Sequence, residues 1–376
     1  SLLWAKHAGG KKEDAGYAVT TDGPGNIFIT GNFQDTVFFE SQQLVSNGGD
    51  DVFIAKYGPE GNLLWVKKVG GILNDFGGGI ATDKNDNCYL TGFFTGTISL
   101  DSFQISSDGF FEDIFLSKLD AQGKILWAKK AGGHNNDRAM GLAVDLRGNS
   151  YFTGAFNSIA VFDSIQLNSN GQSDFFIAKY DTHGKAVWAQ MAGGVKIDEG
   201  HGIAVDEKGN SYATGFFVGE FLFDTLANEI KISSPQNLSS RGDRDIFIVK
   251  YDSEGKFQWA RNSGGAGIDE GRAICSLPSG GCYVTGFIAN NASFGDTVIS
   301  NANDHDVFIS HISYDGNLIS VKKTGSSGYD EGRSIIADAV GNAYLTGNYK
   351  GIPDFGNSKL PESSGDGDVF ILKIKK

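Results

Sequence analysis

The chain has few cysteines and no basic clusters, and each shortage excludes a class of protein. Three cysteines in 376 residues exclude a disulfide framework at this size. Cys275 and Cys282 flank a predicted turn, so a bond between them and a pair of buried thiols both stay open. The net charge is −13 and no run of lysine and arginine exceeds two or three residues. This charge pattern argues against a nucleic-acid partner.

Long apolar runs and catalytic signatures are lacking as well. No apolar run approaches the roughly 18 residues of a membrane helix, and no signal peptide is present, so we expect a mature, trimmed or cytoplasmic chain. The six histidines show no metal-ligand spacing. Neither a nucleophile elbow nor a P-loop occurs. We therefore expect no membrane-spanning segment, no enzyme activity, no cofactor and no metal site.

What the sequence does contain is a repeat. The stretch from Asp174 to Gly194 joins an apolar run, a polar turn with Gly184, and a second run that carries Trp188. Apolar and aromatic runs on both sides of such a turn predict a β-hairpin. The same pattern begins again at four other aspartates, which are Asp51, Asp113, Asp245 and Asp306.

Threonine–glycine pairs define the repeat length. Their glycines are 61, 62, 61, 71 and 61 residues apart, and they are Gly31, Gly92, Gly154, Gly215, Gly286 and Gly347. The chain therefore holds six copies of about 61 residues, and the fourth copy has an insertion near 225–244. Repetition of this kind overrides a domain count based on length, so we expect one domain over 1–376.

Each copy holds four strand-like segments, termed a to d in chain order. In the fourth copy they are 202–206, 211–216, 246–251 and 257–261, with no helical periodicity and many β-branched and aromatic residues. The chain starts with half a hairpin, Leu2–Lys6, and stops with the other half, Asp368–Lys373. These features predict an all-β fold, a six-bladed β-propeller whose N-terminal strand closes the last blade as its outermost strand.

The turn between segments a and b has the pattern D-x-x-G-N, as in Asp145 to Asn149. A glycine at positive φ and a capping aspartate explain this pattern. A calcium loop is the alternative, but the glutamate that such a loop needs after its glycine is absent, even in Asp83 to Asn87. We therefore predict turns here, not metal sites.

The string D-x-F-I-A-K-Y-D-x-x-G-x-x-x-W-A-K-x-x-G-G-x-x-x-D-x-G-x-x-I-A-V-D-x-x-G-N-x-Y-x-T-G recurs along essentially the whole chain. It resembles the bacterial β-propeller repeat family known as SBBP. The resemblance implies a secreted or cell-surface bacterial protein, often a module of a larger chain, and it implies no particular activity. The family is named for seven blades, whereas this sequence has six copies.

The long connections between segments b and c, about 18 residues each, predict one elaborated face. A phenylalanine recurs there and is expected to plug the space between blades, at Phe38, Phe162, Phe223, Phe294 and Phe355. Phe110 and Phe111 are not repeated and are better candidates for contact with a partner. The tripeptide 241–243 (Arg-Gly-Asp) matches an adhesion motif, although chance explains so short a match more readily.

A candidate ligand site lies at the start of the innermost segment a. Each copy has an aspartate there, which we expect to be structural. The residue three positions later varies, and in the last three copies it is His201, Arg272 or Arg333, each near Glu199, Glu270 or Glu331. Guanidinium groups bind carboxylates and phosphates, so these six residues are predicted to bind an acidic sugar or peptide. The alternative is that each arginine pairs with a neighbouring acid and fills the funnel.

Three functions fit these observations. The favoured one is a non-enzymatic binding or scaffold module that engages a protein or glycan partner through the long-loop face. A carbohydrate-active enzyme, such as a polysaccharide lyase that uses the central funnel, is the second. A structural spacer in a surface assembly is the third.

Overall fold

The computed structural model describes residues 3–223, 237–300, 305–352, 354–356, 360–365 and 367–375. All the regular structure of these residues is β. The chain forms two compact units, Ser1–Ser169 with Ile177–Ala189 (unit 1) and Asn170–Phe176 with Gln190–Lys376 (unit 2). Residues 225–236, most of the expected insertion, lie outside the described part of the chain.

Each repeat forms one antiparallel sheet, and the strands follow one another in the order a, b, c, d that the sequence predicted. The a strands are β2 (Asp14–Thr21), β6 (Asp75–Thr82), β12 (Arg138–Val144), β18 (Glu199–Val205), β24 (Glu270–Ser276) and β30 (Glu331–Ala337). The b strands are β3 (Ile27–Phe39), β7 (Cys88–Thr95), β13 (Ser150–Phe156), β19 (Ser211–Phe217), β25 (Cys282–Ile288) and β31 (Ala343–Tyr349).

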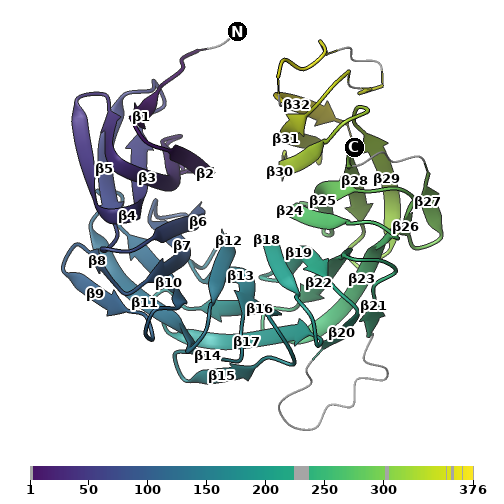
Figure 1. The fold of residues 1–376 in the computed structure, drawn as a ribbon, viewed down its shortest axis with the longest axis horizontal. Helices are drawn as coiled ribbons and strands as arrows, with labels where there is room; N and C mark the ends of the chain where they lie inside the picture. The colour runs from purple at the N-terminus through teal and green to yellow at the C-terminus, as the bar shows by residue number, and fades with distance from the viewer. Residues whose placement is uncertain are drawn as a thin grey trace. The chain divides into compact units, whose positions relative to one another are not determined.

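In the first five sheets the outer half consists of the strongly apolar c strand and the d strand, whereas the last sheet ends at its c strand among the described residues. The c strands are β4 (Gln42–Tyr57), β10 (Glu112–Leu119), β16 (Asp174–Tyr180), β22 (Asp245–Tyr251), β28 (Asp306–Ile312) and β32 (Asp368–Ile374). The d strands are β5 (Leu63–Val69), β11 (Ile125–Gly133), β17 (Ala186–Gly193), β23 (Phe257–Gly265) and β29 (Leu318–Thr324). Six blades of this kind make the fold the predicted six-bladed β-propeller (Figure 1).

A β-bulge in every a strand explains the threonine–glycine signature. The strand register shifts at one residue, so the bulged strand bends there and its side chain is re-aimed. A Cβ atom on the glycine of the facing b strand would then meet a carbonyl oxygen of the a strand, at 1.9 Å for Gly286 and Glu270. Only glycine fits this position. The bulged residues are Tyr17, Gly78, Met140, His201, Arg272 and Arg333.

The aspartate before each a strand is structural, as predicted. Asp75 Oδ2 accepts a hydrogen bond of 2.7 Å from the backbone N–H of Gly71, and Oδ1 accepts a longer one from Thr95. Asp198 and Asp269 repeat this arrangement. Each carboxylate therefore ties the d–a turn to the end of strand b.

The D-x-x-G-N segments are turns, as predicted. In the third repeat, Asp145 Oδ1 accepts hydrogen bonds from the backbone N–H groups of Arg147 and Asn149, both at 2.9 Å. The Asn149 amide donates to Asp145 Oδ2 at 2.8 Å. Gly148 has φ of 83°, a conformation that glycine adopts without strain. The carboxylate is thus occupied by its own turn.

The b–c connections are ordered hairpins in several repeats, where the sequence suggested long loops. These hairpins are β8 (Thr97–Leu100) with β9 (Phe103–Ser106), β14 (Ile159–Phe162) with β15 (Ile165–Asn168), β20 (Glu220–Phe223) with β21 (Leu238–Ser239), and β26 (Ala292–Phe294) with β27 (Thr297–Ile299). The first strands of three of these hairpins, β14, β20 and β26, also pair with the preceding d strand, as Phe162 does with Ala131 and Phe294 with Ser263. The d strands β11, β17 and β23 therefore link consecutive blades.

The N-terminal segment contacts the first repeat as a preceding d strand would, in keeping with its predicted place as a d strand. The sheet β30–β31–β32 has three strands, and residues 3–7 form no regular strand among the residues described. Trp4 Nε1 donates to Pro59 O at 2.9 Å beside Gly61, just as Trp65 contacts Ala121 and Gly123. Strand β1 (Ala8–Gly10) then pairs with β3.

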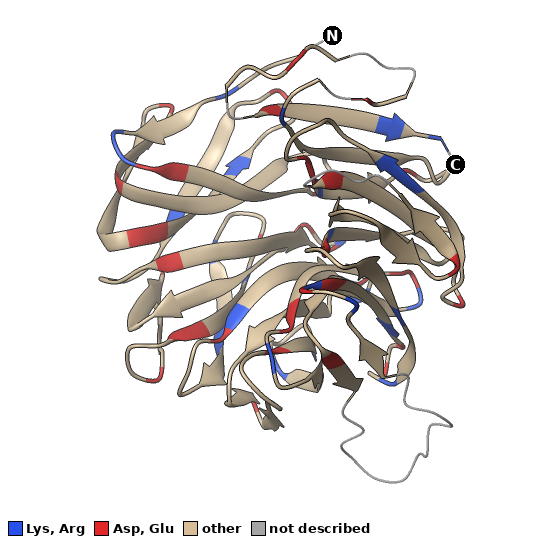
Figure 2. Ribbon diagram, turned by 45° about the vertical axis from the view of Figure 1, so that its right-hand side comes forward, with Lys and Arg blue, Asp and Glu red and all other residues tan. Residues whose placement is uncertain are grey.

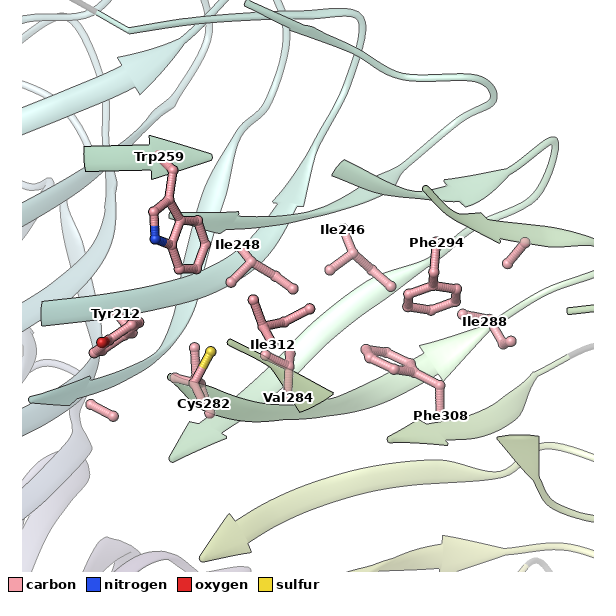
Figure 3. Packing of buried hydrophobic residues seen from close by; sticks show 13 residues of the cluster. Tyr212, Ile246, Ile248, Trp259, Cys282, Val284, Ile288, Phe294, Phe308 and Ile312 are labelled. Carbon is pink, nitrogen blue, oxygen red and sulfur yellow. The ribbon is translucent and has the colours of Figure 1, made fainter. Parts of the chain in front are cut away.

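Apolar side chains fill the space between consecutive blades. In unit 2, Ile246, Ile248 and Trp259 of the fourth repeat pack against Val284 and Phe308 of the fifth (Figure 3). The repeated phenylalanine is a core residue at Phe162, Phe223 and Phe294, as predicted. In the first repeat, however, the buried ring belongs to Phe39, and Phe38 is 49% exposed. A shift of one residue along a strand moves a side chain to the opposite face.

Candidate functional site

The six predicted site residues gather on three a strands of unit 2. Glu199 and His201 lie on β18, Glu270 and Arg272 on β24, and Glu331 and Arg333 on β30. Strand β24 lies beside both β18 and β30 (Figure 1). Since His201 and the two arginines occupy the bulges, their side chains leave the regular alternation of the strand.

Arg272 is the centre of the cluster. Its Nη2 lies 2.8 Å from Glu270 Oε2, and its Nε lies 2.7 Å from Glu331 Oε1. The side chains of Glu270 and Glu331 are 2% and 0% exposed. A buried carboxylate needs a partner charge, so Arg272 compensates two of them at once. The second contact is an ion pair whose N–H group is poorly aligned with the carboxylate oxygen.

Arg333 is the accessible member of the cluster. Its Nη2 lies 2.9 Å from Glu331 Oε2, and its Nε donates to Asn348 Oδ1 at 3.3 Å. Its side chain is nevertheless 63% exposed. An arginine has five N–H donors, so several remain for a ligand.

His201 connects the cluster to Glu199. Its Nε2 lies 3.6 Å from Glu199 Oε2, while its Nδ1 lies 3.2 Å from the carbonyl oxygen of Gly271 and 3.3 Å from Arg272 Nη1. Nδ1 donates to the carbonyl only when it carries a proton, and it accepts from Arg272 only when it does not. The proton position on this ring therefore decides which of the two contacts forms.

The sequence analysis missed Arg244, which belongs to the cluster. This side chain forms an ion pair with Glu270 Oε1, and its guanidinium lies 4.4 Å from the centroid of the Phe216 ring. Arg244 directly precedes the first residue of a c strand, where Glu112 stands in the second repeat and Asp50 in the first. An alignment of the six copies at this position would have found it.

The structure thus brings the six predicted residues together. Arg272 pairs with neighbouring acidic residues, as the alternative to ligand binding expected. Acidic and basic positions are interspersed over the strands and turns of the described chain (Figure 2). Arg333 and the 32% exposed Glu199 remain open to solvent. Ligand binding by the cluster stays a prediction.

The structure also places the exposed aromatic pair, the adhesion-like tripeptide and the two cysteines that the sequence singled out. Phe110 is 89% exposed and Phe111 is 46% exposed. Arg241 of the adhesion-like tripeptide donates through Nη1 to the carbonyl oxygens of Gly264 and Ser293. Cys275 and Cys282 are free thiols, because Cys282 faces Ser276 across the hairpin.

Among the described residues, no three side chains of His, Cys, Asp or Glu gather in a way that would hold a metal ion. The same part of the chain contains no helix with the length and apolar character to span a membrane.

Comparison with known proteins gives distant relatives. No protein-family model matches the chain. An uncharacterized WD repeat-containing protein of Acanthamoeba polyphaga mimivirus is 25% identical over 326 residues, which is 70% of this chain and 23% of that protein. The regulatory protein FlaEY of Caulobacter vibrioides is 24% identical over 188 residues, 48% of this chain and 19% of that protein. The chain thus spans about a fifth to a quarter of these relatives.

Solved structures with similar folds are also distant. A protein of unknown function from Bacteroides caccae has a TM-score of 0.41 at 10% identity, with 78% of each chain covered. A luciferin-regenerating enzyme has a TM-score of 0.37 at 11% identity, and 91% of this chain and 88% of that chain are covered.

Proposed function

We propose that this chain is a non-enzymatic binding module of a secreted or cell-surface bacterial protein, and that it holds a protein partner. The observation that supports this most strongly is the exposure of Phe110 and Phe111. Aromatic side chains on the strands are mostly buried, whereas these two adjacent rings face solvent, and the pair is not repeated in the other copies. Exposed aromatic residues on a rigid scaffold are typical anchors of protein interfaces.

A cavity of mixed character lies at the start of the same connection. Asp108 lines this cavity of about 390 Å³ together with Lys130 and the apolar residues Ile159 and Val161. Ile159 is 47% exposed and Val161 is 40% exposed. A partner with an apolar side chain of its own would bury the two phenylalanine rings and reach this cavity.

The relatives support the assignment as a module. The mimivirus protein is described by its WD repeats, and repeats of this kind build propellers. This chain covers 23% of that protein and 19% of the Caulobacter protein. A propeller of this size is therefore one part of a larger chain in both relatives. The resemblance to the SBBP family supports the surface location.

A glycan partner is the second candidate, and Arg333 favours it. Its free N–H donors suit the carboxylate or sulfate of an acidic sugar. The three glutamates of the cluster make the site selective, because a second negative group on the ligand would be repelled.

The test is quantitative affinity capture from secreted and envelope fractions, with the captured proteins identified by mass spectrometry. A double change, Phe110→Ser with Phe111→Ser, should lower the capture of a specific protein at least about tenfold while the melting temperature stays the same. Val298→Ser, at a site 57% exposed in another repeat, is the matched control. Equal capture by the double variant would refute the proposed surface. If only Arg333→Ala abolishes the binding of an acidic glycan, the result would favour a glycan partner.

A further inference from the structure

A small polar pocket lies in unit 1 between the first two repeats, and the proposed function does not use it. Its volume is about 170 Å³. Tyr17, the bulged residue of β2, lines it beside the b-strand amides Asn32 and Gln34. Glu13, Asp50 and Phe76 complete the lining. Two carboxylates, two amides and two aromatic rings therefore face one small space.

Several polar groups of this pocket have no hydrogen-bond or ion-pair partner among the residues that the structure describes. Asn32 is 4% exposed, and its Oδ1 accepts a hydrogen bond from the backbone N–H of Gly77 at 3.2 Å. Its Nδ2 donates to no residue that the structure describes, although it lines the pocket. Neither Glu13 nor Asp50 has an ion-pair partner in the described ranges. An acceptor on a ligand in the pocket would therefore give this amide a hydrogen bond that the described residues do not supply.

Equivalent junctions in the same protein show what occupies this place elsewhere. Glu112 of the second repeat forms an ion pair with Arg138, whose guanidinium lies 5.1 Å from the centroid of the Phe93 ring. In unit 2, Arg244 forms an ion pair with Glu270 and lies over the Phe216 ring. This is the same ion pair beside an aromatic ring, with the acidic and basic positions exchanged.

The first junction has the carboxylate but not the cation. Asp50 stands at the position of Glu112, Asn32 at that of Phe93, and Phe76 at that of Arg138. The guanidinium that completes the other two junctions is therefore missing, and the pocket occupies its place. Glu13 adds a second carboxylate.

We propose that this pocket binds the guanidinium group of an arginine side chain that a peptide or protein presents. The five N–H donors of guanidinium match the carboxylate oxygens of Glu13 and Asp50 and the amide oxygen of Gln34. Its planar face stacks on aromatic rings, which Tyr17 and Phe76 provide. The peptide carbonyl beside such an arginine supplies the acceptor that Asn32 Nδ2 lacks.

Electrostatics favours a cation at this place. Burial and the charge of Glu13 raise the pKa of Asp50. Burial and the charges of Asp50 and Glu13 raise the pKa of Tyr17. Burial is the larger cause of both shifts, and the neighbouring carboxylates add to it, so a bound guanidinium would offset the repulsion between these groups.

The test is a titration of the full chain with the blocked peptide acetyl-Gly-Arg-Gly-amide, followed by saturation-transfer NMR. The proposal expects binding that Asp50→Asn weakens at least about tenfold, since an opposite charge is lost. Glu112→Gln is the matched control, because it removes a carboxylate of the same design outside the pocket, and binding should not change. Phe76→Arg should abolish binding, because the new guanidinium fills the pocket as Arg138 does in the next junction. Thermal melting shows whether each variant is folded.

Peptides with other side chains in place of arginine show whether the charge and shape of guanidinium are recognised. The citrulline peptide keeps the shape of arginine without its charge and should not bind, whereas the lysine peptide should bind more weakly. Equal binding of citrulline, or binding of a neutral hexose that Asp50→Asn leaves unchanged, would overturn the proposal. If free guanidinium binds as tightly as the peptide, the proposed hydrogen bond between Asn32 Nδ2 and the peptide carbonyl would be refuted. The Phe110 and Phe111 variants leave this pocket intact, so failure here leaves the proposed function standing.

Discussion

The first junction of unit 1 and the junction of β22 with β24 in unit 2 share one backbone design and differ in chemistry. In unit 2, Arg244 and Arg272 compensate the buried Glu270, and every charge in the centre has a partner. In unit 1, Asp50 faces Phe76 and keeps no internal cation. The repeated residues therefore build the frame, whereas a few variable positions next to the bulge decide whether a junction is closed or open to a ligand.

The largest loss of stability is expected from a change to the glycine that faces the bulge of the a strand, a feature that all six repeats share. Gly286→Ala places a Cβ atom 1.9 Å from the carbonyl oxygen of Glu270, and backbone cannot yield as a flexible side chain does. Overpacking in a core costs about 1–3 kcal/mol and occasionally more, and we expect the upper end here. Urea unfolding of the variant gives the change in free energy of unfolding.

Gly16→Ala is the matched control, since a Cβ atom on Gly16 meets nothing within 4 Å. Gly16 lies on an a strand beside its bulge, as Gly271 does. A change of about 0.5 kcal/mol or less is typical of such open positions. Equal destabilisation by the two changes would mean that the bulge does not impose the glycine.

The next effect separates the two arginines of the cluster in unit 2. Arg272→Ala leaves the buried Glu270 and Glu331 with one ion pair fewer each, but Arg244 stays beside Glu270 and Arg333 beside Glu331. A loss of about 2 kcal/mol is expected, below the ~3–5 kcal/mol for a buried charge that keeps no partner. Arg333→Ala removes a pair whose arginine is 63% exposed, so a loss of about 1 kcal/mol or less is expected. Thermal and urea unfolding of the two single variants measure this difference.

This difference changes how ligand binding must be tested. A double change of Arg272 and Arg333 would confuse lost binding with lost stability, so Arg333→Ala is the variant to use. If Arg272→Ala unfolds at the same urea concentration as the wild type, the glutamates are not held by Arg272.

The smallest effect concerns the aspartate that starts each c strand, with or without a lysine beside it. In the second repeat, Lys130 Nζ lies 2.9 Å from Asp113 Oδ2. In the third repeat, Met191 takes the lysine position, and burial raises the pKa of Asp174 to about 7. The ordinary value is about 3.9, so the stability that Asp174 contributes is present below that pH and is lost as pH rises through about 7.

Met191→Lys should lower the pKa of Asp174 and flatten this part of the pH dependence. One pKa unit corresponds to about 1.4 kcal/mol, which sets the scale of the change between pH 5 and pH 8. Urea midpoints at several pH values measure it, and Met191→Leu serves as the uncharged control. An unchanged slope in the lysine variant would assign the pH dependence to other buried carboxyls, such as Asp198 and Asp245.

Most of the fold follows from the sequence, because repetition gives the same evidence six times. The threonine–glycine pairs, the aspartate before strand a and the D-x-x-G-N turns all predict local structure that the protein adopts. The bulge was not predicted. A single extra residue leaves no mark on hydrophobic periodicity, although it positions His201, Arg272 and Arg333.

The candidate site was predictable in its members but not in its partners. His201, Arg272 and Arg333 were found because they vary at a repeated position. Arg244 was not, since it comes from another strand and joins Glu270 only in three dimensions. The shift from Phe38 to Phe39 was missed because two adjacent phenylalanines satisfy the same pattern, and only packing chooses between them.

The outer hairpins have a practical consequence for protein engineering. In the fourth repeat, Glu220 pairs with Ser239 and Phe221 with Leu238, although a much longer sequence joins the two strands than in the third repeat, where β14 and β15 are joined by two residues. The hairpin stem therefore tolerates added length at its tip. The tips at Asp101, Asp163 and Gly295 are positions where a foreign epitope or a reporter peptide can be grafted into the propeller.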